Sequence, residues 1–415
     1  MPQLLPFRNY HYKIGKKEPE KLKGLVAPPY DVIADEELME MKNHPDNICH
    51  VILPDTYEAA GKKLDEMINN GKLTAEEDRC ICIYGIDYTR PDTGEKISRY
   101  GFVGLLRLVE IFPSNDGVIP HEATFKKYTE DRLRIIQETD GNFSPIFTIY
   151  DGNGTAEELF NKYITKKPFL ETIDRDGFTH KIWEVWKVKD IKKFQKIVKK
   201  HDVIIADGHH RYITSLQHSK HGGCNYIMAL FIDFNDPGLI IFPNHRLIHK
   251  LPVSSIDEFK EKVNNEFEIE FIEDFSEFKR KMEKFVGQHV FGVYYLKNYM
   301  ILRLKDHIRP EEYMTEIKRS TEWKNLNLPI LHNILLKKCI GVKIENISFI
   351  KGLEKGINTV DERENIDALF VVNPPLLEEI QKITSLGEIM PQKSTYFFPK
   401  PLSGLIIHRH SSEIE

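Results

Sequence analysis

The stretch "DVIIADGHHRYITSL", residues 202–216, runs from an apolar strand into a helix and decides the fold that we expect. Residues 203–206 are continuously apolar, and apolar side chains recur at helical spacing after Gly208. Asp207 suits the N-cap of that helix, and Gly208 permits a tight turn with a positive φ angle. A strand that turns directly into a helix indicates a mixed sheet of α/β or α+β type.

The same turn predicts an anion-binding site. The first N–H groups of the helix have no partner within it and carry the positive end of its dipole, so they favour phosphate groups. Arg211 can hold a phosphate through two hydrogen bonds, and His209 and His210 can donate hydrogen bonds or transfer a proton. Adjacent histidines point apart, so we do not expect them to share a metal ion. The predicted phosphate or nucleotide site consists of Asp207, Gly208, His209, His210 and Arg211.

Composition narrows the class of protein. The chain has 415 residues, of which 41% are hydrophobic and 29% charged, which predicts a globular protein of two or three domains. The formal net charge of -5 supplies no global positive field, so we do not expect nucleic acid as a partner.

The five cysteines form no CxxC pair, which favours free thiols in a reducing compartment. The start "MPQLLPFRNY" lacks the pattern of a signal peptide, and no apolar run is long enough to cross a membrane. We therefore expect a cytoplasmic protein without a membrane partner. Its oligomeric state stays open.

Strands and helices alternate through the first part of the chain. Residues 80–88 and 100–111 predict a hairpin across a turn-rich linker, and residues 225–234 and 238–250 predict a second strand pair across "NDPG". Further strands are expected at 143–151 and 180–188. Helical periodicity marks residues 56–73, 130–139, 156–164 and 191–200.

The organisation predicts an α+β (mixed α/β) protein in three parts. Residues 1–250 form the phosphate-binding domain, and residues 251–389, with longer charged helices and short strands, form a second α+β domain. The tail, residues 390–415, is too apolar to remain solvated, so we expect it to pack back on the core.

Several motifs together resemble one family. "IADGHHRY" (205–212), "VAPPYDVI" (26–33), "PHEATF" (120–125), "NFSPIF" (142–147) and "MPQKSTYFFPK" (390–400) are similar to the family catalogued as domain of unknown function 1015. The resemblance covers nearly the whole chain and by itself implies no reaction.

A strand followed by D-G-x-H-R and a helix is also similar to the phosphate-binding turn of the ParB and sulfiredoxin superfamily. That group includes CTP-dependent partition proteins, ATP-using sulfiredoxins and kinases of free serine. Only Asp207, Gly208, His210 and Arg211 match this pattern, with His209 at its variable place. The resemblance implies a nucleotide-binding core that uses ATP or ADP with Mg²⁺.

Three further residues are candidates for the site. Asp31, in the rigid "PPYD" segment, is either a general base, a Mg²⁺ ligand together with Asp207, or part of a plain proline turn. Glu122, beside His121, is either an acid/base group or a solvated loop charge. Lys393 either closes the phosphate pocket or lies in an ordinary packed segment.

Other patterns carry no predicted function. The HExxH zinc-protease pattern fails because Phe125 stands where its second histidine is needed. Cys80 and Cys82 share one face of a strand and are expected to be buried thiols. His245 and Arg246 are either part of the pocket or, as we expect, a surface pair.

Three functions remain open on these residues. The first is a nucleotide-dependent kinase of a small hydroxyl metabolite such as free serine, with Asp31 or Glu122 as base. The second is a phosphomonoester phosphatase, such as a phosphoserine phosphatase, in which His209 or His210 acts as acid or nucleophile. The third is a nucleotide-gated DNA-binding protein that is no enzyme, which would require a basic helix-turn-helix near residues 256–285.

Overall fold

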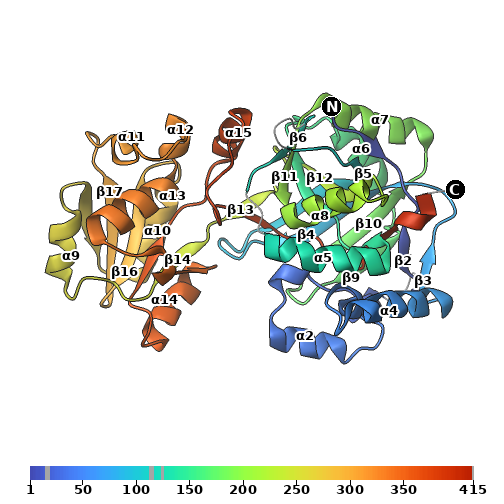
Figure 1. Ribbon diagram of the computed structural model, residues 1–415, viewed down its shortest axis with the longest axis horizontal. Helices are drawn as coiled ribbons and strands as arrows, with labels where there is room; N and C mark the ends of the chain where they lie inside the picture. Colours follow the sequence, from blue (N-terminus) through green and yellow to red (C-terminus); the bar gives the residue numbers. More distant parts are fainter. Residues whose placement is uncertain (15–18, 112–115, 123–125, 414–415) are drawn as a thin grey trace. The chain divides into compact units, whose positions relative to one another are not determined.

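The computed structural model describes residues 1–14, 19–111, 116–122 and 126–413, which fold into two compact units (Figure 1). Unit 1 comprises Met1–Ile240 and Pro399–Glu415, and unit 2 comprises Ile241–Phe398. The chain thus re-enters unit 1 at Pro399. The domain boundaries expected from the sequence, 250 and 389, stay predictions.

Among the described residues, unit 1 contains a nine-stranded mixed sheet in which the order is β6-β11-β8-β12-β5-β4-β10-β9 and β1 pairs with β5. Its strands are β1 (Leu4–Leu5), β4 (Ile81–Thr89), β5 (Lys96–Arg107), β6 (Val118–Pro120), β8 (Ile146–Tyr150), β9 (Leu170–Ile173), β10 (Thr179–Val185), β11 (Val203–Asp207) and β12 (Tyr226–Asp233).

At one edge of this sheet, the ends of strands that are far apart in the sequence lie side by side. β6 runs parallel to β11, with Pro120 beside Ile205, so both strands end at that edge. β8 runs antiparallel to β11, with Phe147 beside Asp207, so β8 begins there. The residues that follow β6 and β11 therefore meet those that precede β8.

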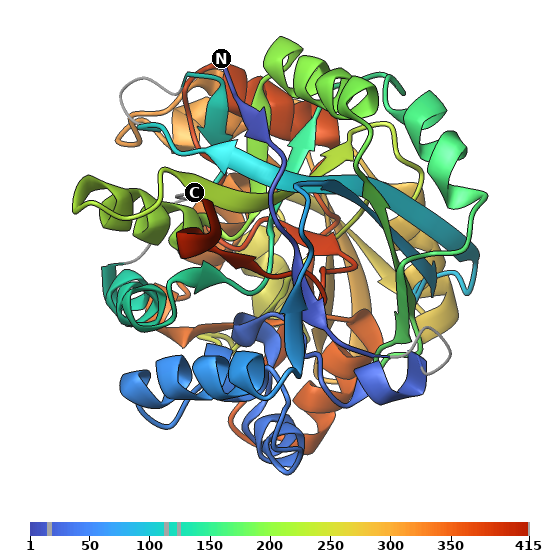
Figure 2. The ribbon, with the colours of Figure 1, turned by 90° about the vertical axis from the view of Figure 1, so that its right-hand side faces the viewer.

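Helices of unit 1 pack against the sheet and against one another. They include α4 (Tyr57–Asn69), α5 (Lys126–Thr139), α6 (Glu157–Ile164), α7 (Val188–Lys200) and α8 (His209–Lys220). α5 lies beside both α4 and α8 (Figure 2). Aromatic rings join helix to sheet in the core. Phe102 of β5 stacks on Phe231 of β12 at 5.0 Å and lies 4.7 Å from the tilted ring of Phe194 of α7, measured between ring centroids.

Unit 2 has its own six-stranded sheet, of order β15-β17-β16-β19-β14-β18. The strands are β14 (His245–Ile248), β15 (Phe267–Ile272), β16 (Val290–Tyr295), β17 (Asn298–Leu304), β18 (Ile347–Ile350) and β19 (Ala368–Val371). Its helices include α9 (Ile256–Val263), α10 (Phe275–Lys284), α14 (Leu353–Glu362), α15 (Leu377–Ser385) and a π-helical segment, Ile330–Ile340. Because β15 separates α9 from α10, residues 256–285 form no helix-turn-helix.

The mixed α/β, α+β fold class is confirmed, and so is the hairpin, which β4 and β5 form. The second strand pair is wrong. β12 pairs with β5 and β8, whereas β13 (Ile240–Phe242) pairs with β20 (Tyr396–Phe398). The "NDPG" turn is anchored to β5 instead, because the Asp236 carboxylate accepts from the Tyr100 backbone N–H at 3.1 Å.

The surface position expected for His245 and Arg246 is also wrong. β14 lies between β18 and β19, and both side chains are buried. Arg246 donates to the backbone oxygen of Asn244 and, at 3.1 Å, to Nε2 of His332. Burial in this inner strand lowers the pKa of Arg246 to about 9.

No helix in the described part of the chain has the length and apolar content of a membrane-spanning segment.

We expect Gly101→Ala to destabilise unit 1. A methyl group at Gly101 of β5 would lie 2.6 Å from the Phe231 carbonyl oxygen and 2.2 Å from Cδ1 of Ile232, so β5 and β12 would have to separate. Overpacking of this kind costs about 1–3 kcal/mol in the free energy of unfolding, which urea denaturation measures. Gly24→Ala, where the nearest atom is 3.5 Å away, is the control. Equal stability of both variants would contradict the tight contact between these strands.

Candidate functional site

The turn after β11 has the backbone that only glycine adopts easily. Gly208 is the N-cap residue of α8, with φ 92° and ψ 24°. A Cβ there would lie 2.8 Å from Cγ2 of Ile146 and 2.9 Å from Nη2 of Arg211. The positive φ angle predicted for Gly208 is confirmed. The predicted cap is wrong: Asp207 ends β11, and α8 has no side-chain cap.

Arg211 fastens the start of α8 to the start of β8. Its Nη1 donates to the backbone oxygen and hydroxyl of Ser144, at 3.1 and 2.8 Å, and to the backbone oxygen of Pro145 at 2.9 Å. Its Nη2 donates to Oδ2 of Asp207 at 3.1 Å. The guanidinium thus holds the "NFSPIF" and "DGHHR" segments together.

Lys400 joins a third and a fourth segment to the same place. Its Nζ lies 2.5 Å from Oδ1 of Asp207 and 3.0 Å from Oδ2 of Asp31. The Lys400 side chain is 8% exposed, whereas that of Asp31, in the 3₁₀ turn Tyr30–Val32, is 42% exposed. Asp31, Asp207, Arg211 and Lys400 therefore form one cluster of alternating charge, which we call the charge cluster.

The cluster holds its ionised state through mutual attraction. Burial alone would raise the pKa of Asp207, but the nearby Lys400 and Arg211 outweigh it and lower that pKa below its ordinary value. Burial alone would lower the pKa of Lys400, but Asp207 and Asp31 raise it above its ordinary value. The two carboxylates and two cations of the cluster sum to no formal net charge.

His209 lies behind this edge as a buried ring. Its Nε2 accepts the backbone N–H of His121 at 3.3 Å, and the two imidazole centroids are 4.7 Å apart. Burial lowers the pKa of His209 well below its ordinary value, so the ring is neutral at neutral pH. This geometry holds the His209 ring against His121, and the acid or nucleophile role predicted for His209 stays a prediction.

His210 and Glu122 are half-buried. His210 stands in the first turn of α8, and Glu122 follows His121 at the end of β6, so the sheet brings both toward the edge where Asp207 lies. Their catalytic roles stay predictions. Residues 123–125 of the "PHEATF" motif lie outside the described residues.

A cavity of about 70 Å³ opens beside Arg211. The guanidinium of Arg132 stacks over the Tyr30 ring at 4.1 Å, so two arginines reach this cavity. Burial raises the pKa of Tyr30, so its phenol is neutral and can donate a hydrogen bond. The lining residues are Tyr30, Ile52, Arg132, Ile135, Ile136, Gly141, Asn142, Phe143, Ser144, Arg211, Thr214, Ser215, Ile227 and Ser403.

Lys393 belongs to unit 2, where its backbone oxygen accepts from Asn244 and Arg246, and its predicted role at the phosphate site stays a prediction. The lysine in contact with Asp207 is Lys400, which the sequence analysis missed. One signal was available: Lys400 ends the same "MPQKSTYFFPK" motif and stands between Pro399 and Pro401, on an extended backbone as rigid as that before Tyr30.

We expect Lys400→Met to lower the free energy of unfolding by about 1–3 kcal/mol, because it leaves Asp207 without its closest cation while solvent still screens Asp31. Urea denaturation measures the loss. Lys200→Met, at the exposed end of α7, is the control. Identical midpoints for the two variants would show that the ion pairs are not formed.

Asp207 should also contribute to acid sensitivity. Because its pKa is lowered in the folded protein, its stabilising effect is complete above about pH 5 and is lost as pH falls below about 4 and through the lowered value. The acid limb of stability against pH should therefore be shallower in Asp207→Asn than in wild type. Asp257→Asn, at a carboxylate 93% exposed, is the control. Parallel acid limbs in all three proteins would contradict the lowered pKa.

Comparison with known proteins places the chain in a family. Among solved structures, it is similar to a free serine kinase in complex with AMP, at 16% identity over 72% of this chain and 91% of that chain, with a TM-score of 0.34. A conserved hypothetical protein from Pyrococcus furiosus is 15% identical over 69% and 90%, with a TM-score of 0.31. C-terminally truncated SbnI from Staphylococcus aureus is 13% identical over 71% and 82%, with a TM-score of 0.34. No curated protein matches the chain. The profile of the family described as protein of unknown function DUF1015 matches residues 4–328, and the chain belongs to that family.

Proposed function

We propose that the protein is a nucleotide-dependent phosphotransferase that moves a phosphoryl group from ATP or ADP to the hydroxyl group of a small metabolite. The observation that carries this proposal is the charge cluster at the start of α8, beside a small cavity lined by two arginines. Phosphoryl transfer needs positioning and charge stabilisation more than covalent chemistry, and these groups supply both.

The phosphates are assigned to the first turn of α8. This helix of 12 residues directs its first backbone N–H groups and its positive dipole end to the edge where Asp207 lies. Of the five N–H donors of Arg211, the contacts among the described residues engage Nη1 fully and Nη2 once. Arg211 can therefore keep Ser144 in place and still donate to a phosphate oxygen.

The cavity sets a limit on what enters it. A volume of about 70 Å³ is several times the roughly 10–15 Å³ that one water needs, so it suits a phosphoryl group or a small metabolite and not a nucleoside. Its apolar walls and the Tyr30 phenol would orient a small polar molecule. Free serine is the first substrate to test, since the D-G-x-H-R turn is similar to that of free-serine kinases.

Asp31 and Glu122 are the candidates for the group that accepts the hydroxyl proton. Asp31 is exposed and touches Lys400, so it can face an incoming substrate. Glu122 follows β6 at the same edge. A carboxylate that positions the attacking hydroxyl is a recurrent part of phosphotransferases.

Magnesium enters this proposal with the nucleotide and not on the Asp31 and Asp207 pair. Both carboxylates already hold Lys400, and Asp207 also holds Arg211, so the cluster carries no surplus negative charge for a divalent cation. These residues do not fit Mg²⁺ as they stand.

The experiment combines binding and turnover. A nucleotide at about 100 times its dissociation constant should add roughly 2.7 kcal/mol to the free energy of unfolding, seen as a higher melting temperature. Phosphorus NMR of protein with serine and ATP or ADP should then show phosphoserine forming while nucleotide is consumed. Asp31→Asn and Glu122→Gln are tested separately. The variant that lacks the catalytic base should have a kcat lower by on the order of 10²-fold or more. Lys200→Met should keep wild-type turnover.

The same samples test the alternatives. Release of phosphate from phosphoserine without nucleotide would indicate the phosphatase and contradict the kinase. A salt-dependent shift of duplex DNA, with no turnover, would indicate the DNA-binding protein. A melting temperature that no nucleotide raises would also contradict the kinase proposal.

A further inference from the structure

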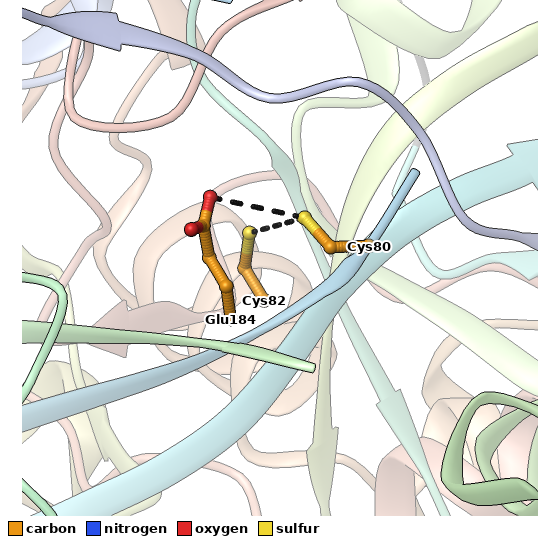
Figure 3. Close-up of side chains that lie close together, drawn as sticks. All are labelled: Cys80, Cys82 and Glu184. Atoms are coloured by element: carbon orange, nitrogen blue, oxygen red, sulfur yellow. Dashed lines mark hydrogen bonds between the residues drawn. The ribbon is translucent and has the colours of Figure 1, made fainter. Parts of the chain in front are cut away.

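A second polar cluster lies in unit 1, formed by Cys80, Cys82 and Glu184. Cys82 is on β4, and Glu184 on β10 is its direct cross-strand partner. Cys80 lies two residues earlier, where its backbone pairs with that of Phe7 in an isolated β-bridge. Figure 3 shows the three side chains directed toward one another.

The spacing of the ligand atoms is that of a metal site. The two Sγ atoms are 3.7 Å apart, and Sγ of Cys80 lies 3.9 Å from Oε1 of Glu184 (Figure 3). All three ligand atoms lie within 4.8 Å of one another. In a tetrahedral zinc site with Zn–S bonds of about 2.3 Å, two sulfurs are about 3.8 Å apart, so the thiols already stand at the required separation.

The cluster is buried, and some of the polar atoms in and beside it lack hydrogen-bond partners among the described residues. Both cysteines are fully buried and Glu184 is 6% exposed. Oε1 of Glu184 accepts from the Asn9 amide at 2.9 Å, but within the described residues Oε2 of Glu184 and Oδ1 of Asn9 have no hydrogen-bond partner. A buried carboxyl group with an unsatisfied oxygen is costly, and a bound cation would offset that cost.

We propose that Cys80, Cys82 and Glu184 bind a buried zinc ion and supply three of its ligands. Thiolate ligands exclude Mg²⁺ and Ca²⁺, which prefer oxygen, and a mixed set of two sulfurs and one oxygen suits zinc. Binding forms two Zn–S bonds and one Zn–O bond and releases to solvent the two thiol protons, together with the proton of the Glu184 carboxyl group where it carries one, with no change of oxidation state. The two thiolates neutralise the charge of Zn²⁺, and the Glu184 carboxylate adds one negative charge, to which the Asn9 amide donates a hydrogen bond from the outer shell.

The alternative is a metal-free group of protonated side chains. Burial raises the pKa of Glu184 to about 7 and that of Cys82 well above its ordinary value, so without a cation the thiols carry their protons at neutral pH. The two states differ in metal content and in thiolate ligation, both of which are measurable. The proposal does not depend on the phosphotransferase activity.

The test uses the full chain, unfolded and refolded with Zn²⁺ or with Co²⁺ as a spectroscopic probe, because the buried site is closed once folded. Elemental analysis after gel filtration should find about one zinc ion per chain. The cobalt form should show thiolate-to-cobalt charge-transfer absorption. Cys82→Ser and Glu184→Gln should each lower zinc retention by about tenfold or more. Cys49→Ser, equally buried and outside the cluster, should retain the metal.

The charge-transfer band separates this site from other metal binding. Asp140, His218 and His410 also lie close enough to hold a cation, but they contain no sulfur and cannot give that band. If Cys82→Ser does not fold, the wild-type cobalt spectrum still decides. Absence of the band from refolded wild type, or zinc retained by a folded double variant Cys80→Ser with Cys82→Ser, would overturn the proposal.

Discussion

The buried ammonium group of Lys400 is the constraint on which the architecture of the site depends. It touches Asp31 and Asp207, and the first of these contacts spans 369 positions of sequence. A buried cation needs carboxylates beside it, because a buried charge without a partner lowers the free energy of unfolding by several kcal/mol. The complete set of ion pairs adds little net stability. The contact therefore acts through specificity: it fixes where the chain re-enters unit 1.

The residues after Lys400 show what this fixed point organises. The Leu402 N–H donates to the Tyr84 hydroxyl, Ser403 bridges to Ala27, and Ile407 bridges to Tyr10. The C-terminal segment thus pairs with strands and loops that lie much earlier in the sequence. A one-residue slip of this segment would remove Lys400 from both carboxylates, so electrostatics and backbone pairing select the same register.

Local signals predicted the turn, and long-range pairing explains what they missed. Residues 203–208 are an apolar run followed by a glycine. This local pattern is enough to predict the strand and the positive φ angle of Gly208. The prolines on either side of Lys400 are a local signal, but its contact with Asp207 depends on the return of the chain to unit 1 at Pro399. Arginine is rarely buried, and the burial of Arg246 becomes tolerable through its position in an inner strand, where backbone carbonyls accept its hydrogen bonds. The sequence indicated that Cys80 and Cys82 share a face, and their 3.7 Å separation confirms it, but the opposing Glu184 required the pairing of β4 with β10.

The neutrality of the charge cluster shapes how an anion can be bound there. A phosphate that approaches does not meet a strong positive field, so attraction must come from fixed dipoles and from donors already in place. The N-terminus of α8 and the guanidinium of Arg211 meet that requirement without reorganisation, because Ser144 and Pro145 hold Arg211 rigidly. In the proposed phosphotransferase, Lys400 would exchange its exposed partner, Asp31, for a phosphate oxygen while it keeps Asp207. Such an exchange would release the Asp31 carboxylate only when phosphate is present, which couples the availability of a base to the arrival of the group to be transferred.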